Sequence, residues 1–217
     1  MDIFTRIFNE IPDIPLKEVL RYAGLKEENE DVKRCIAEAF KVISPKACYV
    51  RLPAGVSEST VDFGEFSVVS NKLSINLEGC KEAYLFCATL GSGIDMLINR
   101  YSSVSPVKAL YFQAIGAAAI ESVCDFLCKK VFPADKDEKL RPRFSPGYGD
   151  FELKHQETIF SVLDCRRKIG VYLTKGGLMV PSKSVTAVAG IGNISENCKS
   201  GCEACSLKEE CEFKKEG

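Results

Sequence analysis

The sequence predicts an α+β fold in which antiparallel strands pack with a long core helix and flanking helices. Three observations predict it. Segments near the start of the chain have apolar residues at helical spacing, and the following segments are rich in β-branched and aromatic residues between turn residues. A long and almost entirely apolar helical segment then occupies the middle of the chain.

The first elements are two short amphipathic helices. Pro15 opens an apolar pattern over 16–23, and Gly24 is placed to end that helix. A second apolar stripe runs from Val32 to Ile43 behind an acidic first turn, which suits the positive end of a helix, and it stops before Pro45.

The chain then changes period. Residues 47–52, 64–69 and 72–77 predict antiparallel strands separated by Gly, Ser and Asn turns. Residues 83–90 form a nearly continuous apolar run of strand length, as a strand covered on both faces would, so we expect it at the centre of the sheet.

The second half of the chain returns to helices and ends in strands. Residues 114–120 are apolar on every side, so the helix that contains them should pass through the core. The expected elements are, in order, a helix at 94–101, a long helix from Pro106 to Phe132, a helix at 153–167, and strands near 170–174 and 184–189.

Composition narrows the class of protein. Of the 217 residues, 29 are Lys or Arg and 30 are Asp or Glu, so the net charge of -1 suggests neither a nucleic-acid nor a membrane partner. The uncharged run 109–120 is shorter than the roughly 20 residues that a membrane span needs. Eleven Cys beside one His, with acidic residues interrupting any leader-like run, predict a cytoplasmic protein with reduced thiols.

Four of the cysteines cluster near the C-terminus, among polar residues. Short spacings let several thiolates converge on one metal, and sulfur ligands suit an iron–sulfur cluster or zinc. The spacing matches neither the usual zinc ribbon nor the bacterial ferredoxin run, so both metals and a metal-free tail stay open. The predicted ligands are Cys198, Cys202, Cys205 and Cys211. The seven other cysteines are expected to be core residues.

Two further features suggest binding. The segment Arg143–Tyr148 has Pro146 to fix a turn, Gly147 to permit unusual dihedrals, and Arg143 to clamp a carboxylate. The same residues would also suit a plain surface turn. Glu121 follows the apolar stretch of the long helix, where a carboxylate either serves a bound cation or faces solvent.

An ordered series of segments resembles the AdoMet-binding reactivation domain of cobalamin-dependent methionine synthase. Weaker similarity extends the match over residues 1–195, which we expect to form one domain, and leaves 196–217 as a cysteine-rich metal-binding tail. The resemblance implies a C-shaped α+β domain with a twisted antiparallel sheet. The matching segments are Arg143–Tyr148, 158–163, 168–174 and 179–185.

The function of this family follows from the chemistry of the cobalt in cobalamin. Cob(I)alamin is occasionally oxidised to inactive cob(II)alamin, and one-electron reduction with methyl transfer from AdoMet restores methylcobalamin. The resemblance implies that Arg143 holds the AdoMet carboxylate, that the backbone at Ser145 and Gly147 approaches the ligand, and that Tyr148 lines the pocket. Glu121 would lie near the positively charged end of AdoMet, and Asp13 would match the family's N-terminal acid.

Two departures from the family remove prolines, since Phe144 follows the Arg and Gly149 follows the Tyr, so the turn is expected to be looser. With no corrinoid-binding Asp-x-His-x-x-Gly motif, the protein is expected to act on cobalamin held by a separate methionine synthase or other corrinoid protein. It would then be a stand-alone methyltransferase accessory, with a flavodoxin or ferredoxin as electron donor. The alternative is an AdoMet-sensing regulatory or docking module without methyl transfer.

Overall fold

The computed structural model describes residues 2–132 and 138–192, which divide into two units, each built from three stretches of chain. The first unit contains residues 2–50, 85–132 and 153–187. The second contains residues 51–84, 138–152 and 188–192. The expected boundary between residues 195 and 196 lies outside the described residues and stays a prediction.

A five-stranded sheet has the order β1-β2-β6-β10-β7, and β6 is at its centre as predicted. Seven of the eight β6 residues are buried, which explains the continuous apolar run. The pairs β1–β2 and β7–β10 are antiparallel, and the fold is α+β. The strands are β1 (Phe4–Ile7), β2 (Lys46–Pro53), β6 (Glu82–Thr89), β7 (Lys139–Leu140) and β10 (Ser184–Gly192).

The edge strand β1 has no counterpart in the sequence prediction. All four of its residues are exposed, so it lacks the alternation of buried and exposed positions that marks a half-buried strand. Phe4 stacks on Tyr49 of β2, with 5.6 Å between ring centroids. This cross-strand aromatic pair fixes the register in which Phe4 lies opposite Tyr49.

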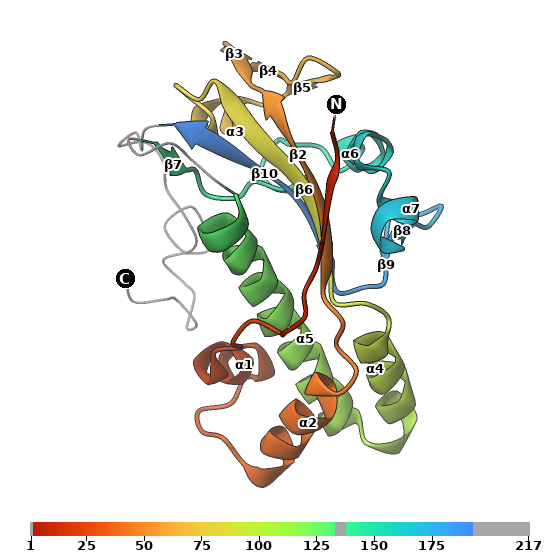
Figure 1. Cartoon of the computed structure of the whole chain (residues 1–217). Coiled ribbons are helices and arrows are strands. Elements are labelled where there is room, and N and C mark those ends of the chain that lie inside the picture. The colour runs from red at the N-terminus through yellow and green to blue at the C-terminus, as the bar shows by residue number, and fades with distance from the viewer. Residues whose placement is uncertain (1, 133–137, 193–217) are drawn as a thin grey trace. The chain divides into compact units, whose positions relative to one another are not determined.

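In the first unit, three helices pack against a long one (Figure 1). Gly24 ends the first helix in the left-handed conformation, with φ +67°, as its position predicted. The Asn29 side chain accepts a hydrogen bond from the Val32 N–H and caps the second helix. The helices are α1 (Leu16–Ala23), α2 (Glu30–Phe40), α4 (Gly93–Val104) and α5 (Pro106–Phe126).

Helix α5 continues as a π-helical turn, η1 (Leu127–Val131). Together they make a 26-residue helix that is long and apolar enough to cross a membrane, longer than the 12-residue run considered from the sequence. Within its most apolar window, 61% is buried inside the fold, as in the core helix of a soluble protein. Eleven of the 21 residues of α5 are buried, which confirms the predicted core helix.

Two predicted elements are wrong. Residues 72–77, predicted as a strand, form helix α3 (Asn71–Asn76) of the second unit, because the Ser70 hydroxyl accepts a hydrogen bond from the Leu73 N–H at 3.0 Å and caps it. The single helix predicted at 153–167 is two helices, since Asp164 adopts a left-handed conformation with φ +49°. These helices are α6 (His155–Leu163) and α7 (Cys165–Ile169).

The remaining strands form two small antiparallel sheets. In the second unit, β3, β4 and β5 form a three-stranded sheet, and in the first unit β8 and β9 form a hairpin. The predicted strand 64–69 is shorter than expected, because only β5 is extended there. The strands are β3 (Gly55–Ser57), β4 (Thr60–Asp62), β5 (Ser67–Val69), β8 (Tyr172–Leu173) and β9 (Met179–Val180).

The seven cysteines of the described residues belong to the interior, as expected, with Cys128 alone among them partly exposed. Three of them meet in the first unit: the Cys48 and Cys165 sulfurs are 4.0 Å apart, and Cys87 interacts with Cys165. The hydrogen bond to Cys165 and burial raise the pKa of the Cys48 thiol. The cluster therefore holds neutral thiols and acts as apolar packing.

We expect Gly93→Ala to destabilise the first unit. A Cβ at residue 93 would overlap the Val42 carbonyl oxygen and would lie 2.8 Å from the Val42 Cβ, so the backbone must move. The expected loss is about 1–3 kcal/mol in the free energy of unfolding, measured by chemical denaturation. The control is Gly176→Ala, where a Cβ would meet only the Thr174 hydroxyl at 3.9 Å. Equal unfolding midpoints for the two variants would contradict the packing.

Candidate functional site

The Arg143–Tyr148 turn lies in the second unit and is held at its start by a strand. Phe144 and Val188 of β10 form an isolated antiparallel bridge. The Phe144 N–H donates to the Val188 carbonyl, and the Val188 N–H donates to the Phe144 carbonyl, both at 2.9 Å. A proline at residue 144 lacks the N–H that this bridge requires, so the first departure from the family adds a hydrogen bond.

The turn closes through its own backbone. The Tyr148 N–H donates to the Ser145 carbonyl at 3.1 Å, and the Gly147 N–H donates to the Phe151 carbonyl at 2.7 Å. Gly147 has φ +95°, a backbone conformation that residues with a side chain rarely adopt. Phe151 is 1% exposed, and its ring stacks on Phe144 with 6.3 Å between centroids. The turn is thus anchored in the core rather than loose, contrary to the expectation from its missing prolines.

Two side chains of the turn have chemistry that suits ligand recognition. The Tyr148 side chain is 70% exposed, which is high for an aromatic residue in a fixed turn, and Arg143 is half-buried. The Gly147 and Tyr148 N–H groups bond within the turn, so recognition by this turn depends on side chains such as the Arg143 guanidinium and the Tyr148 ring. A planar cation binds carboxylates, and an exposed ring stacks on flat heterocycles.

The other predicted site residues lie elsewhere. Asp13 and Glu121 belong to the first unit, and both are exposed. Glu121 therefore does not sit in the apolar interior, although its helix does; the role of both acids stays a prediction. Cys198, Cys202, Cys205 and Cys211 lie outside the described residues. Residues 2–132 and 138–192 contain no group of three metal-ligating side chains.

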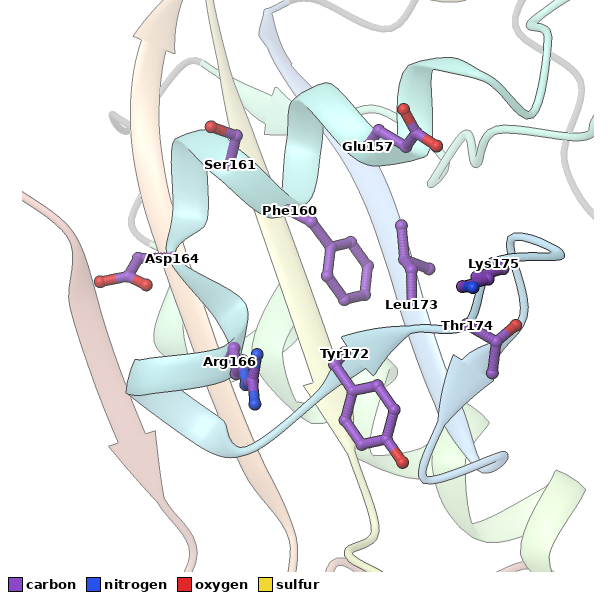
Figure 2. Close-up of a pocket in the computed structure, with 9 residues that line it drawn as sticks. All are labelled: Glu157, Phe160, Ser161, Asp164, Arg166, Tyr172, Leu173, Thr174 and Lys175. Carbon is purple, nitrogen blue, oxygen red and sulfur yellow. The ribbon is translucent and has the colours of Figure 1, made fainter.

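A pocket of about 430 Å³ opens in the first unit between α6, α7 and the β8–β9 hairpin. Figure 2 shows the Phe160 ring beside Leu173 and the Tyr172 ring below it, while the Asp164 carboxylate points away from this group. Asp164 instead pairs with Arg167, at 2.6 Å between Oδ2 and Nε. The lining residues are Glu157, Phe160, Ser161, Asp164, Arg166, Tyr172, Leu173, Thr174 and Lys175.

The pocket combines an aromatic wall with charges of both signs at its rim, so it can hold a small polar organic molecule. It owes its shape to the break at Asp164, which turns α7 away from the axis of α6 (Figure 2). Sequence reasoning missed it, because the apolar pattern at 153–167 continues across Asp164 and does not mark a break there. One signal could have pointed to the pocket: residues 158–163 and 168–174, which flank it, both belong to the segments that resemble the family.

We expect Phe144→Pro to destabilise the turn. The variant loses the donor to Val188 and the ring that stacks on Phe151, so the free energy of unfolding should fall by about 1–3 kcal/mol. Phe144→Tyr is the matched control, because it keeps both the N–H and the ring. Denaturation curves measure the effect, and a midpoint equal to that of the control would refute the role of the bridge.

Comparison with known proteins supports the fold. No family model matches the sequence, and no curated protein matches it. Among solved structures, the crystal structure of the MetH reactivation domain bound to AdoHcy matches with a TM-score of 0.65 and 14% sequence identity. The match covers 90% of this chain and 80% of that chain. The chain therefore has the fold of that reactivation domain, as the ordered resemblance of its segments predicted.

Proposed function

We propose that the protein is a reactivation factor for cobalamin-dependent methionine synthase. It binds AdoMet and presents it for reductive methylation of cob(II)alamin held by a separate partner protein. When bound, AdoMet supplies the methyl group and leaves as AdoHcy, while an external donor supplies one electron. The chain acts as a methyltransferase accessory in the cytoplasm.

One observation carries the proposal. A turn with a half-buried Arg143 and an exposed Tyr148 ring occurs on the fold of a domain whose crystal structure is described as bound to AdoHcy. AdoHcy is the product that AdoMet becomes after it donates its methyl group, so a fold that holds one can hold the other. The turn supplies one cation and one aromatic face, which suit a carboxylate and an adenine ring.

The residues fit AdoMet in the following way. Arg143 binds the carboxylate, the Tyr148 ring packs against the ligand, and Gly147, which has no Cβ, lets the ligand approach the backbone at Ser145 and Gly147. Glu121 and Asp13 belong to the first unit, so a role for these carboxylates near the positively charged part of the ligand stays a prediction of the family resemblance. In this proposal Arg143, Ser145, Gly147 and Tyr148 have the roles that the family resemblance implies.

The partner is the cobalamin-binding domain of a methionine synthase or another corrinoid protein. Within this function, the cysteines at 198, 202, 205 and 211 hold an iron–sulfur cluster that takes an electron from a flavodoxin or ferredoxin. Zinc would use the same four ligands to brace a docking surface instead. The support for a metal is the spacing of these thiols in the sequence.

Arg143→Ala should weaken AdoMet binding about tenfold to a hundredfold, because a charge-assisted hydrogen bond contributes roughly 1.5–3 kcal/mol. Isothermal titration calorimetry measures the dissociation constant. Arg51→Ala is the matched control, because it removes a cation of the same unit that pairs with Glu82 at 2.5 Å and is not part of the turn. Undiminished affinity in Arg143→Ala would remove this residue from the site.

The function itself is tested by mixing the protein with a synthase in the cob(II)alamin state, AdoMet and a low-potential reductant. Methylcobalamin should form, and absorbance measures its formation. The reaction should be slower with Arg143→Ala. No conversion despite AdoMet binding would favour the regulatory module. Cys202→Ser distinguishes the two roles of the cysteine-rich segment. Loss of cobalamin reduction with intact AdoMet binding indicates electron transfer, whereas loss of folding indicates a structural zinc site.

A further inference from the structure

Asp150 lies two residues after Tyr148 and holds the start of α3. Its Oδ1 accepts hydrogen bonds from the Ser70 hydroxyl at 2.6 Å and from the Lys72 N–H at 3.1 Å. Its Oδ2 accepts a hydrogen bond from the Asn71 N–H at 2.8 Å. One carboxylate thus binds two backbone donors and a hydroxyl at a helix end, where N–H groups have no partner within the helix.

Gly149 lets the chain approach this helix closely. It has φ +58°, and a Cβ at this position would overlap the Lys72 Cδ. A proline, which fixes φ near −65°, cannot take this conformation. The second departure from the family therefore makes room for the contact between Asp150 and α3.

The turn is consequently fixed at both ends, while its ligand-facing part is exposed. At one end Phe144 bridges to Val188, and the Asn76 amide donates to the Pro142 carbonyl at 3.2 Å. At the other end Asp150 binds α3. Tyr148 is 70% exposed, and its ring contacts that of Phe144, at 6.5 Å between centroids, so its position depends on the anchors that hold the turn.

We propose that Asp150 is a positioning residue for AdoMet binding, which holds the Arg143–Tyr148 turn in its binding conformation through the N-terminus of α3. This inference rests on the proposed function. The hydrogen bond from Ser70, followed by those from the Lys72 and Asn71 backbone, lowers the pKa of the Asp150 carboxyl. The carboxylate is therefore ionised at neutral pH, and both of its oxygens can accept the three hydrogen bonds.

Asp150→Ala removes all three hydrogen bonds, and Asp150→Asn keeps the shape and one acceptor oxygen. We expect Asp150→Ala to weaken AdoMet binding about tenfold by calorimetry, and Asp150→Asn to recover part of that affinity. Hydrogen exchange gives a readout without ligand: the Gly147 amide, which donates to Phe151, should lose about tenfold protection in Asp150→Ala. Asp62→Asn is the matched control, because its carboxylate accepts the Gly64 N–H in an exposed turn of the same unit.

The outcomes separate the two proposals. If the wild type binds AdoMet, and Arg143→Ala weakens it while Asp150→Ala does not, the positioning role is wrong and the proposed function stands. If the wild type does not bind AdoMet, the proposed function fails and the positioning role fails with it. If Asp150→Ala does not fold, Asp150→Asn decides: wild-type affinity and wild-type Gly147 protection in that variant would overturn the proposal.

Discussion

The first unit depends on the need to remove α5 from water. Its apolar surface extends around the whole helix, so one neighbouring layer is not enough to cover it, and α1, α2 and α4 all pack against it. Small residues set how close these neighbours come. The stem of Lys183 lies against Gly116, where a Cβ would be 2.9 Å from the Lys183 Cε, and its ammonium reaches the Gln113 side chain at 2.6 Å. A lysine thus covers part of the helix with its methylenes while its charge finds a polar partner.

The second unit is organised by contacts between distant segments. Helix α3 has six residues, too few to be stable as an isolated helix, and it forms because its first N–H groups find acceptors. One acceptor is local, the Ser70 hydroxyl, and the other is Asp150, which lies 78 to 80 positions later in the chain. The contact between Asp150 and α3 stabilises the helix and also fixes the end of the candidate turn. One carboxylate therefore affects both the helix and the geometry of the turn.

This explains which features the sequence could predict. Where the determining signal is local, prediction succeeded: Gly24 ended α1, the apolar run at 83–90 marked the central strand, and Pro146 with Gly147 marked the turn. Residues 72–77 alternate polar and apolar side chains, a period-2 pattern typical of strands, and capping by Asp150 overrides that pattern. The break at Asp164 and the pocket beside it depend on a left-handed conformation that Asp adopts more often than most residues, but the apolar pattern continues across this position, so neither was predicted.

The interleaving of the two units has a consequence for synthesis. The first unit needs residues from 2 to 187, and the second needs residues from 51 to 192. Neither can be completed while the C-terminal strand β10 is still within the ribosome, so domain-by-domain folding during translation is closed to this chain. Helix α5 is synthesised before β10, so the nascent protein must keep this apolar segment from aggregating until β10 emerges.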